Sequence, residues 1–371
     1  MKQLKILKFL KCDQINNLNI DISKHLLYNH YNAYGRYIMK KFIKIPLMIL
    51  VSTMILNGCG KTPETVGNNA ETSTETTEQV QSNFYTDYKN STSRPIAVMI
   101  DNDNDDARPH AGIEDAYLVY EITVEGSATR MMAFFDGTKT EKIGPVRSSR
   151  HYFLDYALEH DAIYTHYGWS PMAEKDIPAL GVNNINGLFD NAFWRENKYV
   201  GDYHSAFTSI EKISEQIKNK SYRTERKKAP LSYSDKNYDL DGKNANDVKI
   251  PYAGFYKVAY KYIADNGTYE RYINGSLHPL QNDAKIEAKN IIVIEMAHFS
   301  LGDGSARINI SDVGSGKGYF ITQGKYVPIT WSKTSRDAKT EFKDENGKEI
   351  LLNHGQTWIQ VVSNLSNLVI E

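Results

Sequence analysis

The chain has 371 residues, of which 41% are hydrophobic and 24% charged, and its formal net charge is −1. This balance is typical of a globular protein with a sizeable core, and it excludes a global basic field for holding nucleic acid. The sequence contains two cysteines, Cys12 and Cys59. A disulfide-stapled framework and zinc sites built from several thiolates are therefore excluded as well.

A secretion signal is predicted at residues 39–58. The basic start Met39-Lys40-Lys41 precedes an apolar run from Ile45 to Leu56, which is shorter than the about 20 residues that span a membrane. Small residues then lead to Cys59, as in a lipobox, where the thiol is acylated and the chain is cut before it. We expect a lipid-anchored protein on the extracytoplasmic face of the cell membrane, held by a diacylglyceryl group. An uncleaved signal anchor is the alternative.

The segments on both sides of this signal are not expected to fold. Residues 1–38 come before it, although signals belong at the extreme amino terminus. We therefore interpret Met39 as the true start of translation and residues 1–38 as an upstream start-site extension that is not translated. A translated cytoplasmic extension is the alternative. Residues 59–93 are rich in Thr, Glu, Asn and Ser and cannot bury enough apolar surface to fold. They predict a flexible tether with a reach of roughly 30 Å.

Residues 94–218 are predicted to form a mixed α/β domain, which makes the overall fold class α+β. Apolar runs predict strands, and two segments predict helices, the second of which begins at a capping box. This alternation favours a layered α/β or α+β arrangement. The strands are expected at 96–100, 117–124, 131–135 and 162–167, and the helices at 148–160 and from Thr208-Ser209-Ile210-Glu211 to Ile217.

Residues 251–371 are predicted to form a smaller β-rich domain, joined to the first by a polar, basic linker at 219–250. Regular turn signals separate its apolar runs. They are Asp265-Asn266-Gly267, Gln323-Gly324 and Asn346-Gly347.

Several motifs stand out along the two domains. In the first they are Arg94 to Asn102, Ala107-Arg108-Pro109, Tyr120-Glu121, Val124-Glu125-Gly126, Thr129-Arg130, Gly144 to Arg150, Tyr152-Phe153 and His204. In the second they are Tyr269-Glu270-Arg271, Asn290 to Val293, Thr330 to Lys333 and Gly355 to Trp358. Together they resemble the YerB-like bacterial lipoproteins, a family of two adjoining domains of unknown function. The resemblance covers nearly the whole chain after the tether and implies a location and a fold more than a chemistry.

The run from Gly144 to Arg150 is the most informative candidate site. Pro and Ser are expected to open a helix there, and two arginines flank its free amides, which suits an anion. In the structural alternative, Arg147 or Arg150 pairs with Glu121, Glu125 or Asp101 and ties the helix to the sheet. The candidate ligand-binding residues are Arg130, Arg147, Ser148, Ser149, Arg150, His204, Asp101, Asn102, Arg108 and Glu125.

Other motifs predict no metal and no cofactor. The run Asp101–Asp106 resembles a calcium loop but has Asp106 and Gly112 where an EF-hand needs Gly and Glu, so a solvated turn is favoured. Gly314–Gly318 precedes a predicted strand and opens no helix, so a tight loop is favoured over a phosphate site. No GxSxG elbow is present and no histidine pair has zinc spacing, although His204 is a candidate acid or base.

The sequence therefore predicts a non-catalytic envelope lipoprotein that binds an anionic or glycan-like ligand, or a partner protein. The alternative is an enzyme that transfers or hydrolyses phosphoryl groups on an anionic envelope polymer, with Asp101 or Glu125 holding a metal or acting as base. Convergence of the arginines and carboxylates in one open cleft would favour the enzyme, and pairing inside the core would favour binding or structure. A third possibility is a scaffold that exposes Trp331 and Trp358.

Overall fold

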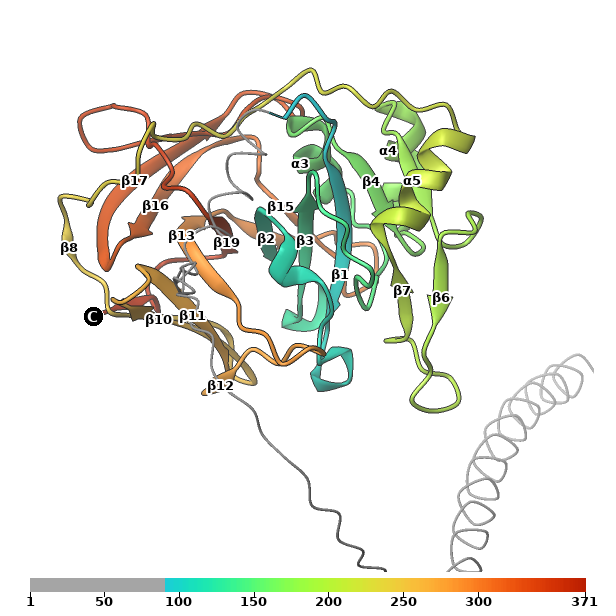
Figure 1. The fold of residues 1–371 in the computed structure, drawn as a ribbon, viewed down its shortest axis with the longest axis horizontal. Coiled ribbons are helices and arrows are strands. Elements are labelled where there is room, and N and C mark those ends of the chain that lie inside the picture. The colour runs from blue at the N-terminus through green and yellow to red at the C-terminus, as the bar shows by residue number, and fades with distance from the viewer. Residues whose placement is uncertain (1–90) are drawn as a thin grey trace, which may run out of the picture. The chain divides into compact units, whose positions relative to one another are not determined.

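The computed structural model describes residues 91–371 (Figure 1). The upstream extension, the signal, Cys59 and most of the tether lie outside the described residues. Strands dominate what is described, and most of them belong to one large mixed sheet with the order β20-β9-β10-β11-β13-β19-β2-β3-β1-β4-β5. Two small sheets are separate from it, one formed by β14 and β15 and the other by β6 (Phe193–Arg195) and β7 (Ala206–Thr208). Between residues 91 and 371, every helix is too short or too polar to span a membrane.

The first domain is built around strand β1 (Ile96–Asn102), which is buried along its whole length. Antiparallel β3 (Thr129–Phe135) pairs with one edge of β1 and parallel β4 (Ile163–His166) with the other. β2 (Leu118–Thr123) lies beyond β3, and β5 (Asn184–Asn186) lies beyond β4. A continuous apolar run suits β1 because both of its faces are covered.

Alternation along β1 sends its side chains to two separate apolar clusters. Val98 and Ile100 pack in the cluster that contains helix α5 (Ile210–Asn219). Ala97 and Met99 pack in the cluster that contains α3 (Phe153–Glu159) and α4 (Pro171–Ala179). The helices therefore cover both faces of this part of the sheet.

The second domain consists of hairpins. Its strands meet at the expected turns, and the sheet formed by these hairpins continues into that of the first domain. The strands are β8 (Lys243–Asn244), β9 (Asp247–Ala253), β10 (Tyr256–Ile263), β11 (Thr268–Ile273), β12 (Ser276–Leu277), β13 (Glu287–Glu295), β14 (His298–Ser300), β15 (Ile308–Ile310), β16 (Gly314–Thr322), β17 (Lys325–Lys333), β18 (Glu341–Lys343), β19 (Gln356–Val362) and β20 (Val369–Ile370).

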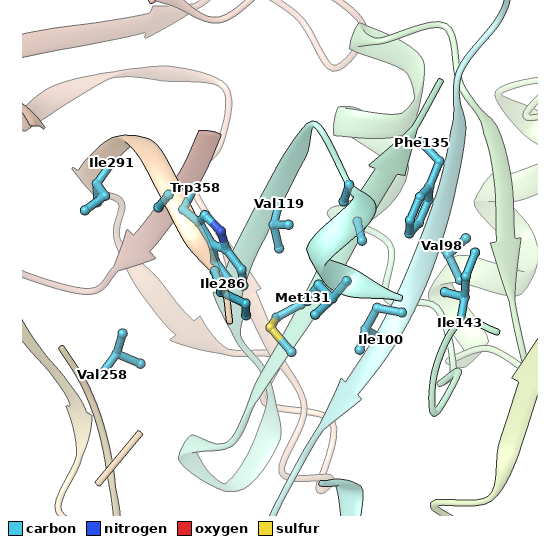
Figure 2. Close-up of a cluster of buried hydrophobic side chains, with 14 of the residues drawn as sticks. Val98, Ile100, Val119, Met131, Phe135, Ile143, Val258, Ile286, Ile291 and Trp358 are labelled. Atoms are coloured by element: carbon cyan, nitrogen blue, oxygen red, sulfur yellow. The ribbon is translucent and has the colours of Figure 1, made fainter. Parts of the chain in front are cut away.

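Strand β19 joins the two domains. It runs parallel to β13 of the second domain on one side and parallel to β2 of the first domain on the other. Trp358 lies between Ile291 and Val119 in this pairing. Figure 2 shows the resulting cluster, which extends from Phe135 and Val98 through Val119 to Trp358. One apolar core is thus shared by both domains.

A buried ion pair crosses the same join. Arg271 on β11 donates to the Glu121 carboxylate on β2 over 2.6 Å, and neither side chain has any exposed surface. The Tyr256 hydroxyl donates to the second carboxylate oxygen over 2.7 Å. The guanidinium also lies 4.6 Å from the ring centre of Trp358. Charges this deeply buried need such partners, because each loses its hydration on folding.

A second group of polar contacts connects the helices of the first domain with the end of β17. Arg336 donates to Asp155 of α3 over 2.7 Å and to Asp176 of α4 over 2.8 Å. The buried Lys333 ammonium donates to Glu159 over 2.6 Å. These ion pairs add a second connection between the domains to the one made through β19.

Three expectations about the fold were wrong. The first domain is not a separate α/β unit, because the sheet that its helices cover on both faces continues into the second domain. The expected helix at 148–160 begins only at Phe153, since Arg147 and Ser149 are in extended backbone that pairs with neighbouring chain. The expected loop at Gly314–Gly318 belongs to β16, where a Cβ on Gly318 would meet the Val293 carbonyl at 2.5 Å.

The linker is held against the folded domains. Arg223 pairs with Asp161 over 2.6 Å and Lys220 with Asp190 over 2.9 Å, both in the first domain. Lys228 pairs with Asp337 of the second domain over 3.2 Å. The basic cluster thus serves to position the linker, and β9 begins at Asp247, before the expected start of the second domain.

The buried pair yields a stability prediction. Arg271→Met keeps much of the side-chain volume but leaves the Glu121 carboxylate buried without its cation. We expect the free energy of unfolding to fall by about 3–5 kcal/mol, measured by denaturant titration. Adding Glu121→Leu is expected to recover part of that loss.

Lys285→Met is the control, because Lys285 pairs with Glu270 on the same strand β11 but is 52% exposed. Exposed pairs contribute less than about 1 kcal/mol. If the two single variants cost the same, the buried pair does not hold the join.

Candidate functional site

The candidate site lies at the carboxyl end of β1. The chain around Arg147 runs beside this end, with the Arg147 amide donating to the Met99 carbonyl over 3.0 Å. The Asp101 amide in turn donates to the Pro145 carbonyl over 2.8 Å. Backbone pairing therefore brings Arg147 next to Asp101 and Asp103, although these residues are far apart in sequence.

Among the candidate arginines Arg130, Arg147 and Arg150, Arg147 is the most exposed, with 24% of its side chain facing solvent. It donates to the Asp103 carboxylate over 2.7 Å, and its Nε lies 3.5 Å from the Asp101 carboxylate. Burial alone would lower the pKa of Arg147, but Asp101 and Asp103 outweigh it and raise the pKa. The guanidinium is held in one orientation with part of its donor edge open.

Arg130 and Arg150 are engaged inside the protein. Arg150 binds the Glu125 carboxylate through two nitrogens, of which Nε donates over 2.9 Å. Burial would raise the pKa of Glu125, but Arg150 and Arg130 lower it to about 2. Arg130 donates to the Ser148 carbonyl over 2.7 Å and has 3% of its side chain exposed. These groups tie the segment after Gly144 to the sheet, as the structural alternative expected.

His204 and Asp101 form a close pair. The His204 Nδ1 lies 2.7 Å from the Asp101 carboxylate, whose other oxygen accepts from the Asp103 amide over 3.1 Å. The hydrogen bond to Asp101 is the main cause that raises the pKa of His204. Burial would raise the pKa of Asp101, but His204 and Arg147 lower it. The arrangement is a hydrogen-bonded pair that becomes ionic when His204 is protonated.

The remaining candidates lie deeper. Asn102 donates to Thr129 and to Tyr256, each over 2.7 Å, and accepts from Arg108, so both are part of the interior. Ser149 is buried and accepts from the Tyr164 hydroxyl over 2.9 Å. None of these three is placed to meet a ligand.

A pocket of about 280 Å³ opens beside Arg147, and we call it the Arg147 pocket. Arg195 enters it while lying 4.5 Å above the Tyr167 ring, and Trp169 lies 5.6 Å from the Phe189 ring next to it. None of its lining residues is acidic. They are Val146, Arg147, Ser148, Tyr167, Gly168, Trp169, Leu188, Arg195, Tyr203 and Ala206.

The sequence reasoning found Arg147 and Ser148 in this pocket and missed its other polar and aromatic residues. Trp169 and Tyr203 come from two loops and Arg195 from the short strand β6 (Phe193–Arg195), and nothing in their spacing predicts that they meet. One signal was available, because segments between 187 and 203 carry large apolar side chains in otherwise polar loops. Such side chains are expected to be exposed, and exposure of this kind indicates contact with another molecule.

The remaining cavity and side-chain clusters do not indicate a catalytic or metal site among residues 91–371. No group of three metal-ligating side chains exists among residues 91–371. A larger cavity of about 610 Å³ lies by Ile96 and Ile163, at the opposite end of β1, under helix α5. Trp331 and Trp358 are buried, so the exposure that would have favoured a scaffold role for the β-rich domain is not observed.

Comparisons with known proteins place this geometry in a family. Residues 82–223 match the N-terminal domain of the DUF3048 proteins of unknown function, and residues 248–359 match their C-terminal domain. A Bacillus subtilis (strain 168) protein named "Putative lipoprotein YerB" is 31% identical over 289 residues, which cover 76% of this chain and 84% of that protein. A crystal structure of YerB protein from Bacillus subtilis matches with a TM-score of 0.68 at 28% identity, covering 76% of this chain and 94% of that chain. The resemblance to YerB and the two-domain organisation are confirmed.

The His204–Asp101 pair predicts a pH-dependent contribution to stability. A histidine whose pKa is raised on folding stabilises the fold fully below its unfolded pKa of about 6.5, and the contribution is lost as pH rises through the folded pKa. We expect His204→Asn, which keeps a donor to Asp101, to be more destabilising at pH 5.5 than at pH 8.5 in denaturant titrations.

His166 provides a control of opposite sign. Burial lowers the pKa of His166 to about 4, so it opposes folding at low pH. His166→Asn is therefore expected to be less destabilising at pH 5.5 than at pH 8.5. Equal slopes for the two variants would contradict the assignment of His204 as the charged partner of Asp101.

Proposed function

This chain belongs to the DUF3048 family, and on that premise we propose that it is a lipid-anchored envelope protein that binds an anionic ligand at the Arg147 pocket without transforming it. The relative named as a lipoprotein supports the anchor, together with the lipobox-like run that ends at Cys59. A thiol acylated after export would hold the protein at the extracytoplasmic face of the cell membrane.

The observation that carries the binding proposal is a pair of arginines in a pocket without acidic residues. Arg147 presents part of its guanidinium there, and Arg195 is exposed, stacked on Tyr167 and held by a hydrogen bond of 3.0 Å to Ser205. Two fixed guanidinium groups favour carboxylate or phosphate oxygens through charge and through paired donors. An acidic surface on a partner protein would meet the same two arginines.

Pairing of the other charged candidates supports binding over catalysis. Glu125 is occupied by Arg150, and Asp101 is fully buried with His204, Arg147 and the Asp103 amide around it. Asp101 has no exposed surface, and Glu125, although 29% of its side chain is exposed, already binds Arg150 through two nitrogens. The His204–Asp101 pair is the one observation that favours phosphoryl transfer or hydrolysis, because a carboxylate that orients a histidine is common in general-base catalysis.

The anchor is tested by replacing the thiol. Cys59→Ser is expected to abolish labelling by a fatty-acid probe in cells and to move the protein from the membrane fraction to the soluble or secreted fraction. Ser73→Ala, in the predicted tether, is the control and is expected to change neither. Persistent labelling of Cys59→Ser would place the lipid elsewhere and contradict the proposal.

The binding site is tested with polyphosphate as a generic polyanion, by calorimetry on the acylated protein in detergent. Arg147→Ala plus Arg195→Ala is expected to weaken binding at least about tenfold, which is about 1.4 kcal/mol, and to reduce its salt dependence.

Arg307→Ala is the control, because Arg307 is an ion-paired arginine of similar exposure, 29%, in the second domain. Binding that survives the double substitution, or that Arg307→Ala weakens equally, would contradict the proposed site. Release of phosphate from the polymer, lost in His204→Asn, would favour the enzyme.

A further inference from the structure

We infer that the ligand of the Arg147 pocket is an acidic polysaccharide, whose sugar rings pack on exposed aromatic side chains while its acid groups bind the arginines. This inference rests on the proposed binding function and names the class of ligand. It is carried by the apolar surface around the pocket, which the binding of a simple anion does not require.

Large apolar side chains gather at this end of the first domain. Phe189 is 74% exposed, Tyr203 72% and Leu188 52%, and Leu188 and Tyr203 line the pocket. Of the twelve large hydrophobic side chains that are exposed between residues 91 and 371, six lie between Met172 and Tyr203. Leaving such groups in water is unfavourable, and their concentration indicates a contact surface.

Aromatic rings and arginine side chains lie together in and beside the pocket. Trp169 and Phe189 lie next to each other at 5.6 Å, and Arg195 covers the Tyr167 ring at 4.5 Å. Aromatic faces offer an apolar surface on which the C–H faces of a sugar ring can pack. The neighbouring guanidinium groups provide donors for acid groups on the same ring. A ligand that uses both features carries a ring and a negative charge in each unit.

The volume of the pocket favours a polymer over a small molecule. About 280 Å³ is slightly less than the roughly 300–1,000 Å³ of pockets that enclose small ligands. The pocket therefore has room for a single ring with its acid group, and the exposed Phe189 and Tyr203 offer contacts for adjoining units outside it.

The position of the pocket also suits a polymer of the envelope. Ser93 and Arg94, where the tether meets the domain, precede the start of β1, whereas Arg147 lies beside its end. Seven residues of strand separate the two points by about 20 Å. The pocket is thus removed from the junction with the proposed anchor, on a part of the domain that a wall polymer could approach.

The test compares three probes of matched length on the acylated protein in detergent. Oligogalacturonate carries a ring and a carboxylate in each unit, its methyl ester carries the ring alone, and polyphosphate carries charge alone. We expect oligogalacturonate to bind at least about tenfold more tightly than either of the others by calorimetry.

Variants separate the two contributions. Phe189→Ala plus Tyr203→Ala is expected to weaken oligogalacturonate binding about tenfold and to leave polyphosphate binding within about twofold. Phe255→Ala is the control, because Phe255 is 58% exposed on the turn before β10 in the second domain. Circular dichroism and thermal unfolding of each variant confirm that the fold is retained.

Three outcomes would overturn the inference. If polyphosphate binds through the arginines and oligogalacturonate binds no more tightly, the pocket takes simple anions and the inference fails while the proposed function stands. If uridine monophosphate binds as tightly as oligogalacturonate, the rings recognise a base and not a sugar. If neither polyanion binds, the proposed function fails and the inference fails with it.

Discussion

The ion pair between Glu121 and Arg271 is the contact on which the rest of the structure depends. Both side chains are without exposed surface, so their charges are stabilised only by each other and by the polar groups that surround them. Strand β19 brings these partners together, because it lies between β2, which carries Glu121, and β13, which pairs with β11. The sheet and the buried charges therefore depend on one another, because β19 lies between the strands that bring Glu121 and Arg271 together.

A chain of hydrogen bonds extends from this pair to the candidate site. Arg271 donates to Nδ1 of His278, whose Nε2 lies 2.7 Å from Nδ1 of His110. Nε2 of His110 lies 2.7 Å from the Asp101 carbonyl, which can only accept. Each histidine thus donates through Nε2 and accepts through Nδ1, and both are neutral, because burial lowers the pKa of His110 to about 3 and holds that of His278 well below its usual value. The backbone of Asp101 is thereby tied to the second domain, while its side chain holds His204.

The sequence predicted those parts of this arrangement that depend on local pattern. The buried strands follow from apolar runs, as for β1. The start of α5 lies one residue later than the capping box predicts, because Ser209 and not Thr208 is the N-cap, with its hydroxyl accepting from the Lys212 amide over 3.2 Å. The neighbourhood of Arg147, Asp101 and His204 was also predicted. The partner of Glu121 was not, because Arg271 is 150 residues away in sequence and several arginines nearer in the chain were equally plausible. Arg195, Trp169 and Tyr203 of the Arg147 pocket were missed for the same reason, since strand β6 and two loops supply them and only the folded chain sets their distances.

Some charged residues of the first domain are paired in its interior and others face the Arg147 pocket, and this difference explains why the pocket is suited to binding. The carboxylates Glu125 and Asp101 neutralise Arg150 and His204 within the protein, and Asp103 orients Arg147 without covering it. Arg195 is held by an aromatic ring and a hydroxyl, so its positive charge is not neutralised by its neighbours in the pocket. Positive charge is therefore left in the Arg147 pocket, although the formal net charge of the chain is −1. Because Arg147 is already hydrogen-bonded to Asp103 and Arg195 to Ser205, an anion that binds there orders few additional side chains, and preorganisation of this kind makes a small pocket effective.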